Sequence, residues 1–303
     1  MKKFKFHLIH LKKNGLIIVT AFLVFMLFNV CTEIEASAVS TVASKDGVPI
    51  AFQVHGQGKG DIALVFIHGW CCDRSYWEKQ IPHFAAKYQV VTIDLAGHGD
   101  SGPNRKDWTM KAFGEDVRAV VKKLGLKKVI LIGHSMGGAV IAEAARLLPQ
   151  QVIGLVGVDI FHNVELKYSP EQIKLILAPV RADFVKDTQN AVRNFMFTPN
   201  SDPQLVKKIA DDMSSAPAKI GVATFEEYLK HDLLTTLKDV QAPTHCINSN
   251  RLLRTNIEAG QRHFHSFKVK LMSKVGHFIM IEDPETFNHL LDETVKELIQ
   301  LKN

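Results

Sequence analysis

The sequence predicts an α/β protein with a mostly parallel central sheet, helices on both faces and a helical insertion. Three observations lead to this prediction. Short β-branched runs alternate with amphipathic stretches of helical period, as in right-handed strand–helix–strand units. Some of these runs, such as 62–67 (IALVFI), are apolar at every position, which is typical of strands buried on both faces. Over residues 162–238 the alternation stops, and helix-like pieces separated by prolines follow.

The expected elements follow in chain order. Two strands flank the turn Lys45-Asp46-Gly47 within residues 39–54. Strands and helices then alternate, with strands at 62–67, 89–95, 128–133 and 152–160 and helices at 75–87, 109–125 and 136–148. The insertion contains four helix-like pieces, at 171–178, 188–197, 202–213 and 224–234. The first pattern resumes with a strand at 243–249, a helix at 255–264, a strand at 267–275 and a helix from Pro284.

The first 38 residues are excluded from this fold because they resemble a targeting segment. Five lysines and no acidic residue occur within residues 1–14, and the apolar run GLIIVTAFLVFMLFNV follows. Ala36-Ser37-Ala38 then matches a signal-peptidase site. A cleaved signal peptide, an uncleaved membrane anchor and lipidation of Cys31 remain open, although large residues before Cys31 disfavour the last. We expect export to the periplasm or the extracellular space, with any membrane contact through an uncleaved leader.

Composition narrows the class of protein. The chain of 303 residues has 46% apolar and 22% charged residues, so it can form a large core without metals or disulfides. Residues 1–14 carry five positive charges and no acidic residue, against a net charge of +6 for the whole chain, so nucleic-acid binding is not expected. The four cysteines form no disulfide framework and no zinc motif, so no metal or cofactor is predicted. For the adjacent Cys71 and Cys72 we favour packing as small apolar side chains, and a place in a pocket wall or redox activity stays open.

The strongest functional motif is Gly133-His134-Ser135-Met136-Gly137-Gly138, at the end of a strand and the start of a helix. A G-x-S-x-G sequence in this position makes a sharp turn that exposes the serine hydroxyl. The start of the helix adds free N–H groups, which favour a developing oxyanion. Ser135 is therefore the predicted nucleophile.

Residues from about 40 to 303 resemble the α/β-hydrolase family, because four motifs occur in the family's order. These are His68-Gly69 after a buried strand, Gly97-His98-Gly99-Asp100-Ser101, the serine motif and Gly276-His277-Phe278. The resemblance implies a hydrolase core in two parts, 39–161 and 239–303, with a helical lid at 162–238. It also implies that His277 is the general base and that the backbone N–H groups of Trp70 and Met136 bind the oxyanion.

The acid of the triad departs from the family pattern. The family usually places an aspartate after the strand that follows the insertion, but here that strand leads to Asn250. Asp159 ends the strand after the nucleophile helix, and a carboxylate there is costly unless it is paired. We predict Asp159 as the partner of His277 and keep Asn250 as the alternative. Three other aspartates are interpreted as structural, the last on a helix surface: Asp94, Asp100 and Asp116.

A serine at this turn favours acyl transfer. The expected protein is a carboxylesterase-like serine hydrolase that cleaves a small-molecule ester or related acyl bond through an acyl-enzyme, without a cofactor. Relatives with an aspartate nucleophile, such as haloalkane dehalogenases, are disfavoured. The alternatives are a ligand-binding or signal-perceiving homologue with little turnover, a C–C bond hydrolase and a cofactor-free haloperoxidase-like member.

Overall fold

The computed structural model describes residues 38–302, apart from 57, 59 and 252. The predicted leader lies outside these residues except for Ala38. Within the described part of the chain, no helix has both the length and the apolar character needed to cross a membrane.

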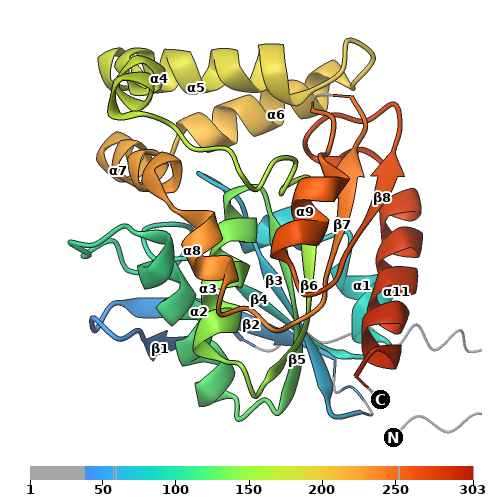
Figure 1. The fold of residues 1–303 in the computed structure, drawn as a ribbon. Coiled ribbons are helices and arrows are strands. Elements are labelled where there is room, and N and C mark those ends of the chain that lie inside the picture. The colour runs from blue at the N-terminus through green and yellow to red at the C-terminus, as the bar shows by residue number, and fades with distance from the viewer. Residues whose placement is uncertain (1–37, 57, 59, 252, 303) are drawn as a thin grey trace, which may run out of the picture. The chain divides into compact units, whose positions relative to one another are not determined.

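A single eight-stranded sheet forms the centre, in the order β1-β2-β4-β3-β5-β6-β7-β8 (Figure 1). β1 pairs with β2 and β2 with β4 in antiparallel fashion, and every other pair is parallel. The strands are β1 (Ser40–Ala43), β2 (Pro49–His55), β3 (Ile62–Ile67), β4 (Gln89–Ile93), β5 (Lys128–His134), β6 (Val152–Val158), β7 (Thr244–Ser249) and β8 (Phe267–Met272). The predicted mostly parallel sheet is confirmed.

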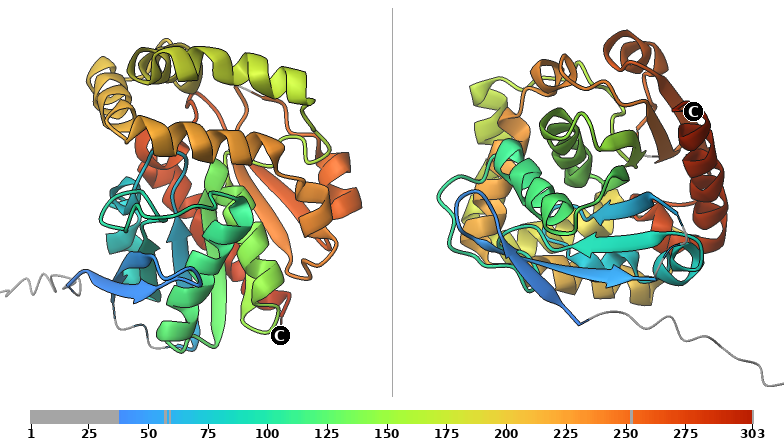
Figure 2. Two further views of the ribbon diagram at one scale, coloured as in Figure 1. Left: turned by 90° about the vertical axis from the view of Figure 1, so that its left-hand side faces the viewer. Right: turned by 90° about the horizontal axis from the view of Figure 1, so that it is seen from below.

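Helices cover both faces of the sheet (Figure 2). One face packs against α2 (Met110–Lys123), α3 (Met136–Leu147) and α9 (Ile257–His263). The other packs against α1 (Ile81–Ala85), α10 (Ile279–Glu282) and α11 (Pro284–Gln300). The central strand β3 therefore contributes alternate residues to two cores, with Val65 in one and Leu64 and Phe66 in the other. Because both cores exclude water, every position of this strand is apolar.

The regular elements between β6 and β7 are all helical, and residues 170–237, which contain them, form the helical segment. They are α4 (Pro170–Ala182), α5 (Phe184–Ala191), the π-helical turn η2 (Val192–Met196), α6 (Pro203–Ser214), α7 (Ala218–Lys230) and α8 (Leu233–Leu237). α4, α5 and α6 lie above the carboxyl ends of the parallel strands (Figure 1). Pro179 was expected to end a helix but lies inside α4. The carbonyl that it leaves without a helical donor belongs to Leu175, whose residue is 73% exposed, so water can solvate it.

The prediction of one continuous helix over residues 75–87 is wrong. The chain instead forms a 3₁₀ turn, η1 (Arg74–Trp77), and then the short helix α1. Pro82 occupies the first turn of α1, where a missing N–H breaks no helical hydrogen bond. The proline therefore starts the second piece, and the two pieces stay separate.

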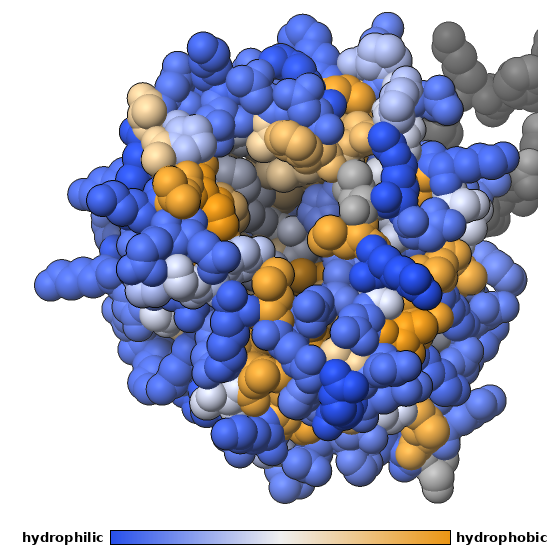
Figure 3. Space-filling view, turned by 45° about the horizontal axis from the view of Figure 1, so that its top comes forward, coloured by the Kyte–Doolittle hydropathy of each residue, from blue (hydrophilic) through white to orange (hydrophobic). Residues whose placement is uncertain are grey.

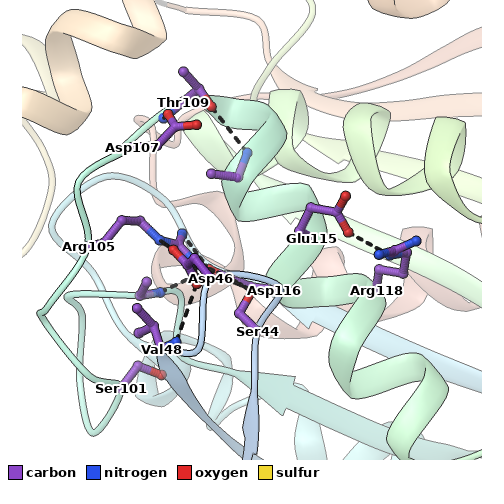
Figure 4. A network of polar contacts seen from close by, with 12 residues as sticks. Ser44, Asp46, Val48, Ser101, Arg105, Asp107, Thr109, Glu115, Asp116 and Arg118 are labelled. Carbon is purple, nitrogen blue, oxygen red and sulfur yellow. Dashed lines mark hydrogen bonds and ion pairs between the residues drawn. The ribbon is translucent and has the colours of Figure 1, made fainter.

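A buried ion cluster ties the β1–β2 hairpin to α2 (Figure 4). Arg105 donates from Nη1 to Asp116 Oδ2 at 3.0 Å and from Nε to Asp46 Oδ2 at 2.7 Å. Ser44 Oγ donates to Asp116 Oδ1 at 2.5 Å. Asp116 has no exposed surface, so its expected place on a helix surface is wrong. The hairpin and the Arg105 loop cover that side of α2 and supply the donors that a buried carboxylate needs.

Candidate active site

Ser135 lies in a strained turn between β5 and α3. Its φ of 52° and ψ of −123° are unusual for a residue with a side chain, and such backbone costs about 1–3 kcal/mol. The turn requires glycines on either side of Ser135, because neighbouring backbone atoms leave no space for a Cβ there. A Cβ on Gly133 would lie 2.3 Å from Gly137 O, and one on Gly137 would lie 2.6 Å from His68 O. The G-x-S-x-G spacing thus follows from how tightly strand, helix and the His68 loop pack.

His277 and Asp159 meet although 118 residues separate them in the chain. His277 Nδ1 lies 2.6 Å from Asp159 Oδ2, and the aspartate is 2% exposed. Burial alone would raise the pKa of Asp159, but hydrogen bonds from His162 and His277 outweigh it and hold that pKa below its ordinary value. Asp159 is therefore a carboxylate at neutral pH.

Asn250, the alternative partner of His277, is exposed. Its backbone N–H donates to the carbonyl oxygen of Met272, the last residue of β8, at 3.0 Å. The structure thus brings the predicted Asp159 to His277. The catalytic roles of both residues stay predictions.

Ser135 and His277 line one cavity of about 120 Å³ between the sheet and the helical segment. Its walls are mostly apolar and include Trp70, Val180, Met196, Met213, Phe225 and Phe278. Tyr228 of α7 lines both this cavity and a second one of about 440 Å³. Figure 3 shows the surface hollowed on the side of the helical segment, with apolar side chains along the rim.

The expected oxyanion donors lie beside Ser135. Trp70 and Met136 both line the cavity. A Cβ on Gly69 would lie 3.2 Å from Ser135 Cβ, so the loop that carries Trp70 packs directly against the serine. The Met136 N–H is the first of α3, where helical N–H groups have no partner within the helix. Trp70 Nε1 donates to Gly221 O at 2.8 Å, which anchors its ring to α7.

The adjacent cysteines Cys71 and Cys72 are buried, and neither forms a disulfide bond. Burial raises the pKa of both Cys71 and Cys72, so neither is a thiolate at neutral pH. Cys72 contributes to the cavity wall as a small uncharged side chain. Among the described residues, no cluster of three or more His, Cys, Asp or Glu could hold a metal ion.

The loop that carries His277 is fastened to the helical segment, which the motif analysis did not reveal. The His277 N–H donates to Met196 O at 2.7 Å, and a Cβ on Gly276 would lie 2.3 Å from the same oxygen. Glu282 accepts from Gly276 N at 2.8 Å and from Ser201 Oγ at 2.6 Å. The last residue of the π turn and Ser201, which follows the turn, therefore hold the loop of the expected base.

His162 is the second feature that sequence reasoning missed. Its Nε2 lies 3.4 Å from Asp159 Oδ1, on the side of the carboxylate away from His277. The only sequence signal is the spacing of three residues between Asp159 and His162, directly after a buried strand.

Comparison with known proteins agrees with this fold. A family model described as alpha/beta hydrolase fold matches residues 62–211. Together with the sheet order, this match shows that the chain has the α/β-hydrolase fold.

Individual relatives resemble the chain over different lengths. The chain is 39% identical over 98 residues to a dihydrolipoyllysine-residue acetyltransferase component of an acetoin cleaving system from Pseudomonas putida, covering 32% of this chain but only 26% of that protein. It is 24% identical over 270 residues to 3-oxoadipate enol-lactonase 1 from Acinetobacter baylyi, covering 85% of this chain and 97% of the relative.

Two solved structures share the fold. A thermophilic esterase from Thermogutta terrifontis has a TM-score of 0.74 at 23% identity and covers 86% of this chain and 99% of its own. A bromoperoxidase from Bacillus anthracis has a TM-score of 0.72 at 21% identity and covers 86% of this chain and all of its own. At these identities the two structures support the fold alone.

Proposed function

We propose that the protein is a serine hydrolase that cleaves carboxylic esters or related acyl bonds through an acyl-enzyme. The observation that carries this proposal is the contact of His277 Nδ1 with Asp159 Oδ2 at 2.6 Å, beside a cavity that His277 shares with the strained Ser135. Relatives named as an enol-lactonase and an esterase support a hydrolase in general.

The mechanism follows from the roles of these groups. His277 Nε2 takes the proton of Ser135 Oγ as this oxygen bonds to the substrate carbonyl carbon. The negative charge on the carbonyl oxygen is stabilised by the N–H groups of Trp70 and Met136. The bond to the leaving alcohol then breaks, and His277 gives that alcohol its proton. Water repeats the sequence on the acyl-enzyme, releasing the carboxylic acid and restoring Ser135. Asp159 holds the Nδ1–H of His277 throughout and stabilises the transient imidazolium.

The size of the cavity sets the expected substrate. A protein cavity of roughly 150 Å³ binds benzene, and the cavity at Ser135 measures about 120 Å³. We therefore propose a small substrate with an acyl or alcohol group no larger than a benzene ring. The helices between β6 and β7 act as its lid in this proposal, because Val180, Met196 and Met213 come from them.

Labelling with a fluorophosphonate probe tests the nucleophile directly. Wild-type protein should label at neutral pH, and Ser135→Ala should not. A wild-type protein that fails to label would refute the acyl-enzyme mechanism. A series of p-nitrophenyl esters from acetate to octanoate then tests the substrate size, with the highest kcat/KM expected at the short end.

Two alternatives have distinct signatures. A ligand-binding homologue would label slowly and release no product, whereas the carboxylate of Asp159 beside His277 supports turnover. A haloperoxidase-like activity, suggested by the name of the Bacillus anthracis structure, would use the same residues. Bromination of an added acceptor in the presence of a carboxylic acid, peroxide and bromide would identify it.

We also propose that the protein is exported, on the evidence of its N-terminal sequence alone. Mass spectrometry of the protein from its native host should find a new N-terminus just after Ala38 if the leader is a cleaved signal peptide. An intact leader in the membrane fraction would instead identify an anchor.

A further inference from the structure

The carboxylate of Asp159 has a separate set of partners on each oxygen. Oδ2 faces His277 Nδ1. Oδ1 accepts from the backbone N–H of Ser249 at 2.8 Å and lies 3.4 Å from His162 Nε2. Ser249 is the last residue of β7, so the end of β7 and the chain just after β6 together hold the side of Asp159 that faces away from His277.

A chain of hydrogen bonds determines which nitrogen of His162 carries its proton. The Asn248 amide is oriented by Ile160, whose N–H donates to Asn248 Oδ1 at 3.2 Å and whose carbonyl accepts from Asn248 Nδ2 at 3.0 Å. Nδ2 also donates to Thr255 Oγ1 at 3.0 Å. The threonine hydroxyl therefore has its own proton free for His162 Nδ1, which lies 3.1 Å away.

This arrangement assigns the neutral tautomer of His162. Nδ1 accepts from Thr255, so the ring proton is on Nε2 and points to Asp159. The distance of 3.4 Å makes this the weakest of the three contacts to the carboxylate, and it acts mainly through the direction of the Nε2–H dipole. Because Asp159 is 2% exposed, water cannot replace a lost donor easily.

We propose that His162 is a positioning residue for the acid of the triad, and that Thr255 acts through it by fixing its tautomer. The inference rests on the proposed serine hydrolase function. His162 with Ser249 keeps Oδ2 turned toward His277, so the imidazolium that forms in each half-reaction always meets an aligned carboxylate. The His277 ring also faces His134, with ring centroids 4.6 Å apart, so its position depends on partners on both sides.

Four variants test this role. His162→Phe keeps an aromatic ring but removes the donor, and His162→Gln keeps a donor at a similar reach. Thr255→Val removes the hydroxyl, and the double variant combines it with His162→Phe. The matched control is His289→Phe, which removes an exposed histidine of α11 that lies 3.3 Å from Glu293 and does not line the cavity at Ser135.

The readouts are kcat, KM, the pH profile of kcat/KM and the melting temperature. His162→Phe should lower kcat by about tenfold to hundredfold with little change in KM, the range expected for a misplaced catalytic group. In this variant the Asp159 carboxylate has lost one hydrogen-bond donor, so it stabilises the protonated form of His277 more strongly. The acid limb of the kcat/KM profile should therefore move to higher pH. His162→Gln should restore most of kcat. Thr255→Val should have a smaller effect, and none in the His162→Phe background.

The outcomes separate the two proposals. A wild-type protein that does not label with a fluorophosphonate refutes the hydrolase itself, whatever the variants do. A labelled wild type with a His162→Phe variant that behaves like His289→Phe refutes the positioning role. A His162→Phe variant with a lower melting temperature but an unchanged acid limb of the kcat/KM profile also refutes the positioning role, because His162 would then contribute to stability alone. If His162→Phe does not fold, the acid limb of Thr255→Val decides.

Discussion

Replacing Asp159 by asparagine tests the triad with almost no change in shape. Oδ1 must stay an oxygen, because it accepts from Ser249 N and faces His162. The new NH₂ group can then only face His277, where Oδ2 now lies 2.6 Å from Nδ1. Two donors cannot share that contact, so the imidazole must move its proton to Nε2, the nitrogen that should accept the proton of Ser135.

The expected loss follows from this change of tautomer. In a serine triad of another fold the same substitution lowers kcat by about 10⁴, which corresponds to about 5.4 kcal/mol of transition-state stabilisation. The loss of kcat would be measured by steady-state hydrolysis of p-nitrophenyl acetate, and the rate of fluorophosphonate labelling would give a second measure of it. Asn250→Ala is the comparison and should stay within about threefold of wild type, because an exposed surface side chain contributes little. An Asp159→Asn variant with kcat near the wild-type value, or a collapse of kcat in Asn250→Ala, would refute the assignment.

The same variant has a signature in stability. The pKa of Asp159 is lower in the folded protein than its ordinary value of 3.8. A lowered pKa stabilises the folded state at pH values above the ordinary one, and this contribution is lost as the pH falls toward the folded-state pKa. The difference in unfolding free energy between wild type and Asp159→Asn should therefore shrink as the pH drops below about 4. A difference that does not change with pH would mean that the carboxylate's charge contributes nothing to stability.

Three further predictions concern other parts of the molecule. Asp116→Asn should cost about 3 kcal/mol in urea unfolding, because the buried Arg105 loses its buried charge partner and keeps the exposed Asp46; a loss below about 1 kcal/mol would contradict that view of the cluster. Gly137→Ala should abolish fluorophosphonate labelling and lower the melting temperature, since its Cβ would lie 2.6 Å from His68 O; normal labelling would show that the turn can relax. Tyr228→Ala should join two cavities and raise the preference for octanoate over acetate esters by about tenfold, equivalent to burying about two more methylenes; an unchanged preference would place the acyl chain elsewhere.

Local patterns predicted much of this fold because they report local requirements. The strand 62–67 is apolar throughout because both of its faces are buried, and any such strand shows the same run. The turn at Ser135 is visible in sequence because Gly133 and Gly137 have no space for a Cβ. Asp159 was identified by the cost of burying an unpaired charge, which requires a partner somewhere.

What the sequence did not reveal depends on contacts between distant segments. Asp116 resembles an exposed helical residue until Arg105 and the hairpin at Ser44, 72 residues away, cover it. Met196 supplies only a backbone oxygen to His277, and a backbone group has no signature in the sequence. His162 acts through a chain that crosses from β6 to the segment after β7, so no spacing rule could find its partners.

The bond between Met196 O and the His277 N–H has a consequence for anyone who redesigns the cavity. Val192–Met196 is an attractive place for substitutions, because Met196 lines the cavity while Phe195 is 70% exposed. A new side chain there that also shifts the backbone would pull His277 away from Ser135, and selectivity would be gained at the expense of rate. Libraries should therefore vary side chains in this turn and exclude prolines, glycines, insertions and deletions.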